Sequence, residues 1–180
     1  MRPFKSVTIV KYPLDLVWIT IRDRLSELAP FMDDIEKVIC LEREEQPDGT
    51  IRLVNLWQVN PKLPALRVAD LSPEALAWID RAEWQVHNYE CSWRIESHLL
   101  PEHIQCLGRT RYEPAIGGRG TRITFEGQLE MTTHNLAGVP FFLDGTLLKG
   151  IELLATTLIP KNLRKLTEAV SVFLDKTRAS

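Results

Sequence analysis

Hydrophobic and polar side chains alternate with a period of two through most of the middle of the chain. Such alternation predicts half-buried β-strands, in which successive side chains point to opposite faces of a sheet. The predicted strands cover residues 35–46, 50–60, 78–86, 88–96, 103–113 and 121–132. The turn Pro47-Asp48-Gly49 supplies the positive φ values that a tight hairpin needs. Successive hairpins of this kind predict an antiparallel sheet.

One strand and a helical region precede these six strands. Residues 4–12 are rich in Val, Ile and Thr and predict a strand, which Pro13 ends. Apolar residues then recur at helical spacing over residues 14–28. Pro30 ends that helix, and residues 31–35 predict a short second turn.

Helical spacing returns over residues 138–177, where an apolar stripe runs to the end of the chain. Pro160 interrupts this stripe, which predicts either a bent helix or two nearly continuous ones. Residues 61–75 carry three prolines and are expected to be irregular. The whole pattern predicts an α+β chain that forms one domain over residues 1–180.

The order of elements resembles the helix-grip fold of the START-like superfamily, which includes steroid-transfer domains, pollen-allergen-type proteins and polyketide cyclases. Three stretches carry the resemblance. Residues 12–18 (YPLDLVW) look like the family's Pro-x-x-x-Val-Trp strand exit, residues 35–38 (IEKV) match its second-strand opening, and residues 162–166 (NLRKL) are similar to its terminal-helix signature. The resemblance implies a curved seven-stranded antiparallel sheet around a long C-terminal helix, in the order β-α-α-β-β-β-β-β-β-α.

The resemblance also implies a ligand site, since members of the superfamily hold lipids, sterols, quinones or polyketides between sheet and helix. The inward-facing parity of each predicted strand gives the candidate residues. On the strands these are Asn55, Trp57, Trp78, Asp80, Tyr89, Trp93, Thr110, Tyr112, Phe125 and Leu129, and on the terminal helix Leu147, Ile151, Leu154 and Leu158. Gly108 and Gly127 are expected to let the sheet bend and to leave room inside. Plain core packing is the competing interpretation for each aromatic residue.

Asp80 is a carboxylate on an otherwise apolar parity between Trp78 and Trp84. A buried, unpaired carboxylate is costly. We therefore expect it either to pair with Arg109 or Arg111, or to face a polar pocket that raises its pKa, or to turn to solvent at a bulge.

Composition narrows the range of functions. A net charge of −2 with 26% charged residues gives no basic excess that would favour nucleic acid. The N-terminus lacks the apolar region of a secretory signal and no stretch reaches the ~18–20 apolar residues of a membrane span, so a cytoplasmic protein is expected. Cys40, Cys91 and Cys106 share no ligand-like spacing and are expected to be reduced and buried in strands.

No metal or cofactor is predicted, because the four histidines form no convergent cluster. They are His87, His98, His103 and His134. The chain also lacks a Gly-x-Ser-x-Gly nucleophile elbow. The glycine-rich stretch 117–120 precedes a strand rather than a helix, which indicates a hairpin and not a phosphate loop.

Three functions remain open. The first is a binding or transport module for a small hydrophobic ligand. The second is a cyclase or dehydratase in which Asp80 and Tyr112 act as acid groups, and the third is an interaction subunit whose interior is filled. A basic patch of Lys161, Arg164 and Lys165 is either a solvated helix face or a transient contact to anionic membrane. An exposed edge strand would also allow pairing with a second copy.

Overall fold

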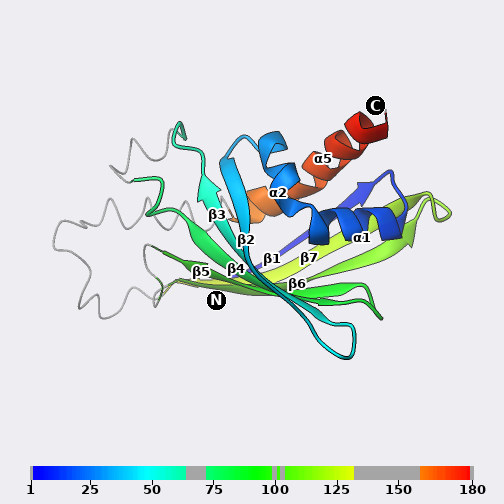
Figure 1. The fold of residues 1–180 in the computed structure, drawn as a ribbon, viewed down its shortest axis with the longest axis horizontal. Coiled ribbons are helices and arrows are strands. Elements are labelled where there is room, and N and C mark those ends of the chain that lie inside the picture. Colours follow the sequence, from blue (N-terminus) through cyan, green and yellow to red (C-terminus); the bar gives the residue numbers. More distant parts are fainter. Residues whose placement is uncertain (1, 64–71, 99–100, 102–103, 132–158, 179–180) are drawn as a thin grey trace.

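A seven-stranded antiparallel sheet carries all the described helices on one of its faces (Figure 1). This computed structural model describes residues 2–63, 72–98, 101, 104–131 and 159–178. The strands are β1 (Arg2–Val10), β2 (Ile35–Glu45), β3 (Ile51–Val59), β4 (Trp78–Gln85), β5 (Glu90–Ser97), β6 (Ile104–Ala115) and β7 (Gly120–Met131). All the predicted strands are present, which confirms the predicted helix-grip arrangement.

The strands lie in the order β1-β7-β6-β5-β4-β3-β2. Strands β2 to β7 follow chain order, and the first strand pairs with the last, so that Val10 lies opposite Thr121 and Arg2 opposite Leu129. β1 and β2 are therefore the two edges of the sheet. The helices between them cross its concave face (Figure 1).

The first helical region is divided, although one continuous helix was expected over residues 14–28. It consists of α1 (Leu14–Asp23), α2 (Leu25–Leu28) and a 3-10 turn, η1 (Ala29–Phe31). Arg24 leaves the helical conformation with φ −122° and ψ 25°, and its guanidinium pairs with Glu27 at 2.7 Å. The prediction of one helix is therefore wrong at Arg24. Leu25 and Leu28 of α2 are both buried in the core.

The terminal helix α5 (Ile159–Arg178) buries one stripe of apolar residues. These are Leu166, Ala169, Val170, Phe173 and Leu174. Pro160 lies in the first turn of α5, where its missing N–H costs little. The predicted helical segment 138–158 lies outside the described residues.

Polar contacts hold α5 near both of its ends. Lys165 Nζ lies 3.1 Å from Asp34 Oδ2, and Lys161 Nζ lies 3.4 Å from the same oxygen. Near the C-terminal end the hydroxyl of Tyr12 donates to Asp175. Two residues of the predicted basic patch thus form ion pairs that fix the helix to the segment before β2.

The predicted hairpin turns are confirmed. Gly49 has φ +83°, and the Asp48 carboxylate accepts a hydrogen bond from the Thr50 N–H at 2.9 Å. Gly117 and Gly118 also have positive φ, in the turn that joins β6 to β7. The glycine-rich stretch is a hairpin, as its position before a strand predicted.

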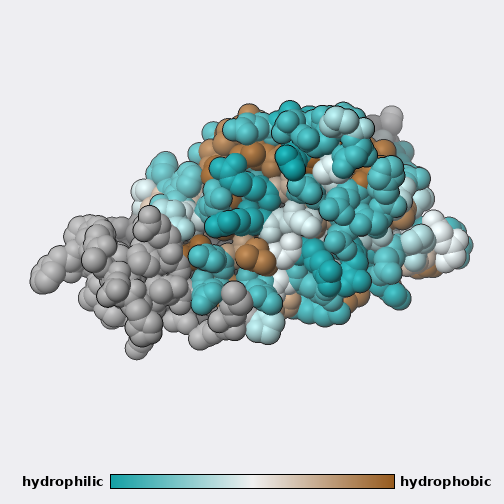
Figure 2. All heavy atoms as spheres, turned by 90° about the horizontal axis from the view of Figure 1, so that it is seen from below, coloured by the Kyte–Doolittle hydropathy of each residue, from teal (hydrophilic) through white to brown (hydrophobic). Residues whose placement is uncertain are grey.

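The outer face of the sheet is largely hydrophilic (Figure 2). Glu126 on β7 lies at the centre of a charged group with Lys5 at 2.6 Å and Arg111 at 3.0 Å. Hydrogen bonds from these two cations lower the pKa of Glu126 to about 2.

The cysteines divide between core and surface. Cys91 and Cys106 are buried as predicted, whereas Cys40 is exposed, so its predicted burial is wrong. Cys40 lies on edge strand β2, most of whose residues after Val38 are exposed. None of the helices described here has the length and apolar character to cross a membrane.

Gly108 and Gly127 lie opposite each other on β6 and β7, under the indole ring of Trp93. A Cβ at Gly108 would lie 2.3 Å from the Glu126 carbonyl oxygen and 2.6 Å from Trp93. A Cβ at Gly127 would lie 2.8 Å from the same ring. The expectation that these glycines leave room inside is therefore wrong, because Trp93 fills the space above them.

Gly108→Ala should destabilise the protein, because the new methyl group meets backbone atoms that cannot rotate away. We expect the free energy of unfolding, measured by urea denaturation, to fall by about 2–3 kcal/mol. Ser92→Ala, at an exposed position on β5, is the control and should stay within ~0.5 kcal/mol of the wild type. Equal stability of Gly108→Ala and the wild type would contradict the close packing described.

Candidate functional site

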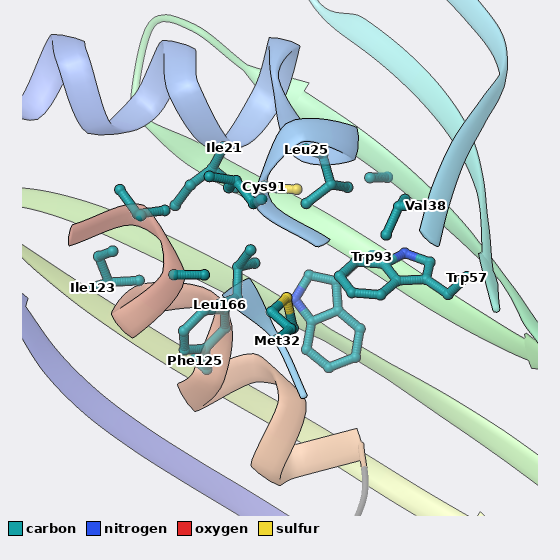
Figure 3. Packing of buried hydrophobic residues seen from close by; sticks show 14 of the residues in the cluster. Ile21, Leu25, Met32, Val38, Trp57, Cys91, Trp93, Ile123, Phe125 and Leu166 are labelled. Carbon is teal, nitrogen blue, oxygen red and sulfur yellow. The ribbon is translucent and has the colours of Figure 1, made fainter. Parts of the chain in front are cut away.

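A cavity lies between the concave face of the sheet and the first turns of α5. Its volume is about 60 Å³, which corresponds to about two water molecules at the ~30 Å³ that one water occupies in the liquid. The sheet lines it with Trp57, Trp78, Asp80, Ala82, Trp84, Cys91, Trp93, Ile95, Thr110, Tyr112 and Phe125. The helices line it with Ile21, Leu25, Asn162, Leu163 and Leu166. Side chains from α1, α2, α5 and the sheet point toward this interior (Figure 3).

Aromatic rings make up much of the cavity wall. Trp57 and Trp78 are paired across β3 and β4, and their rings stack with centroids 5.6 Å apart at 15°. Trp84 packs against Tyr112 with centroids 5.9 Å apart. Flat apolar walls of this kind suit a flat apolar ligand, since concave aromatic surfaces are typical of small-molecule sites.

Trp93 is fixed within this wall rather than free to turn. Its indole N–H donates a hydrogen bond to the Thr110 hydroxyl at 3.0 Å, and its ring stacks on Phe4 with centroids 6.1 Å apart. Buried Trp side chains normally find such a partner for the N–H.

Among the described residues that line the cavity, Asp80 is the one with a carboxylate side chain. It lies opposite Asn55, whose amide nitrogen is 3.5 Å from Asp80 Oδ2. Burial raises the pKa of Asp80 to about 6, and the Asn55 amide and the Trp57 indole N–H only partly oppose this rise. The Trp57 nitrogen has no partner within hydrogen-bond distance among the described residues. Its effect on the pKa of Asp80 is therefore exerted over a longer distance. Asp80 is half-buried, and it belongs to the lining of the cavity.

The expected pairing of Asp80 with Arg109 or Arg111 is wrong. Both arginines extend from the outward parity of β6 and pair with Glu126, at 3.4 Å and 3.0 Å. Asp80 has the inward parity of β4, so the sheet itself separates the two kinds of charge. Asp80 instead lies in the lining of the largely apolar cavity, where burial raises its pKa.

Tyr112 is the second titratable group of the wall, and 4% of its surface is exposed. Burial raises its pKa well above the ordinary value, and the nearby Cys91 and Asp80 raise it further. The phenol therefore stays protonated at neutral pH and can serve as a hydrogen-bond donor.

Asn162 was not among the predicted site residues, although it lies within the stretch that resembles the family's terminal helix. It is 4% exposed, and neither atom of its side-chain amide has a hydrogen-bond partner in the described part of the chain. The available signal was a polar residue four positions before Leu166 on an apolar stripe. Sequence analysis also missed Ile21 and Leu25, because their contact with the cavity depends on how the first helices cross the sheet.

The structure gathers many of the predicted residues around this cavity. The predicted residues that line it are Trp57, Trp78, Asp80, Trp93, Thr110, Tyr112 and Phe125. Asn55 and Leu129 are buried near it without being part of its lining. The predicted helical residues Leu147, Ile151, Leu154 and Leu158 lie outside the described residues.

Tyr89 is not part of the cavity lining, although its side chain lies on the helical side of the sheet, as its predicted inward parity requires. It belongs to the turn between β4 and β5, has φ +51°, and its hydroxyl donates to Asp15 on α1. Its ring packs edge-on against Trp18.

Within the part of the chain that the structure describes, no group of three or more His, Cys, Asp or Glu residues could hold a metal ion. His87 and His98 are exposed. His103 and His134 lie outside the described residues.

Solved proteins share this fold. A protein from Thermus thermophilus is 20% identical, with a TM-score of 0.62 over 94% of this chain and 97% of that one. The Zhui aromatase/cyclase from a Streptomyces species is 15% identical, with a TM-score of 0.64 over 94% of this chain and 93% of that one. Norcoclaurine synthase from Thalictrum flavum is 10% identical, with a TM-score of 0.60 over 96% of this chain and 86% of that one.

These similarities establish the fold. They confirm that the chain has the helix-grip fold that the resemblance implied. No family model matches the sequence, and no curated protein sequence matches it significantly.

The raised pKa of Asp80 makes the stability of the protein depend on pH. Between the unfolded pKa of 3.8 and the folded pKa of about 6, the folded state binds the proton more tightly. Stability therefore decreases as the pH rises through this window, by about 1–3 kcal/mol in total. Asp80→Asn should unfold at higher urea than the wild type at pH 7, and this difference should vanish near pH 4.

Glu126→Gln is the control for this measurement, because the pKa of Glu126 is shifted in the opposite direction. That variant should lose stability relative to the wild type at pH 7 and should approach it only as the pH falls toward 2. If Asp80→Asn gave no gain at pH 7, the carboxylate would have to be solvated.

Proposed function

We propose that this protein binds a small hydrophobic ligand in the cavity between the sheet and α5. The observation that carries the proposal is the aromatic wall around the Asp80 carboxylate. A cavity of about 60 Å³ favours a compact molecule over a sterol or a long acyl chain. The shared fold adds support, since its concave face is a common place for a small-molecule site.

A cavity-filling variant tests binding directly. Ala82 on β4 lines the cavity and is 5% exposed, so Ala82→Leu adds three carbon atoms to the cavity wall. We expect at least a tenfold loss of affinity for a compact environment-sensitive dye with a single aromatic ring, such as 4-(dimethylamino)benzonitrile, measured by fluorescence titration. Thermal unfolding should remain cooperative, because the added atoms enter empty space.

Leu107→Phe is the control for this variant, because Leu107 is exposed on the outer parity of β6. It adds apolar surface outside the cavity and should leave dye binding unchanged. If both variants bound the dye like the wild type, the dye would bind elsewhere. A wild-type protein that bound neither dye nor a copurified ligand in native mass spectrometry would favour the interaction subunit.

A second candidate function is an enzyme of the cyclase or dehydratase kind. Its support is that a carboxyl group with a pKa of about 6 and a protonated phenol, Tyr112, line one cavity. A group with a pKa near the working pH can both give and accept a proton, which typically accelerates a reaction by ~10²–10⁴-fold.

The two functions differ in what Asp80→Asn and Tyr112→Phe should do. For an enzyme, both variants keep the affinity for a small aromatic ketone but lose at least ~100-fold in its turnover, measured by product analysis. The wild-type rate should also change around pH 6. Binding without any turnover by the wild type would leave the carrier as the function.

A further inference from the structure

An unpaired side-chain amide lies in the lining of the apolar cavity. Buried polar side chains nearly always find a hydrogen-bond partner, and those that do not call for an explanation. Asn162 is 96% buried, yet neither its Nδ2 donor nor its Oδ1 acceptor has a partner among the described residues. Another buried polar residue of α5 is satisfied: the Thr167 hydroxyl donates to the Arg164 carbonyl at 2.7 Å.

The position of Asn162 places this amide opposite the aromatic wall. Asn162, Leu163 and Leu166 are the α5 residues of the lining, and the sheet supplies the facing side. Leucine at position 162 would continue the apolar stripe of α5 without any unpaired group. An arrangement that sacrifices local stability in this way is expected where a side chain serves a ligand.

The chemistry of the amide defines its complement. A ligand hydroxyl can accept a hydrogen bond from Nδ2 or donate one to Oδ1. The Trp84 indole N–H, which also lacks a partner in the described part of the chain, is a further donor on a lining residue. The Trp57 indole N–H, on another lining residue, also lacks a hydrogen-bond partner among the described residues.

We propose that Asn162 is the specificity-determining residue of the cavity and that it selects aromatic molecules bearing a hydroxyl group over apolar molecules of the same shape. This inference rests on the proposed binding function and adds the class of ligand to it. A site built to hydrogen-bond a hydroxyl rejects the analogue that lacks it, because its polar groups are then left unpaired.

The test compares two probes that differ in one group, p-cresol and p-xylene, by NMR titration of the full chain. The wild type should bind p-cresol at least tenfold more tightly. Asn162→Leu should reduce this ratio to about twofold or less while p-xylene still binds. Thr167→Val, which alters a buried polar residue of the same helix that already has a partner, should keep the wild-type ratio.

Thermal unfolding without ligand provides a second, independent readout. If Asn162 serves a ligand, Asn162→Leu should melt at a higher temperature than the wild type, because it removes an unpaired amide. A lower melting temperature would assign Asn162 a structural role and overturn the proposal. An unchanged preference for p-cresol in Asn162→Leu would overturn it as well, and loss of that preference in Asp80→Asn alone would assign the selection to Asp80.

Failure of this inference can be told apart from failure of the proposed function. If p-xylene and p-cresol bind equally well to the wild type, and Ala82→Leu weakens both, the cavity binds ligands but Asn162 does not select them. If neither probe nor the dye binds, the cavity is not a ligand site.

Discussion

An antiparallel sheet that curves around an apolar concave face requires another element to cover that face. In this protein α5, together with α1 and α2, covers it near the cavity. Its apolar stripe supplies the hydrophobic contact, and the pairs Lys165–Asp34 and Tyr12–Asp175 fix its direction. The cavity exists because these contacts hold α5 over the sheet while the side chains between them leave a gap.

The polar groups in this gap carry a free-energy cost, because they are buried without full hydrogen bonding. Asp80 is kept away from the arginines that pair with Glu126 on the outer face, and its main partner is a neutral amide at 3.5 Å. Asn162 has no partner among the described residues. An interior selected for stability alone would carry apolar side chains at both positions.

The size of the cavity also depends on individual packing choices. Paired glycines on β6 and β7 bring the sheet close to Trp93, which then occupies the space that the missing side chains release. The stacked Trp57 and Trp78 rings form another part of the wall. The interior is thus mostly aromatic core, with a compact remaining space, and this favours recognition of a compact molecule.

The sequence by itself determined the strands, their hairpins and the inward parity of Trp57, Trp78, Asp80 and Tyr112. The reason is that a period of two and turn chemistry are local properties, which a chain carries before it folds. The resemblance to a known superfamily added the position of the cavity, because that position follows from the order of the elements.

The tertiary structure alone decided which partners the inward residues meet. The break at Arg24, the displacement of Tyr89 into a turn and the pairing of Asp80 with Asn55 all depend on residues distant in sequence. The unpaired Asn162 could not be predicted either, since its isolation depends on which described residues surround α5 once it has packed against the sheet. Long-range packing sets these contacts, and the local pattern carries no information about them.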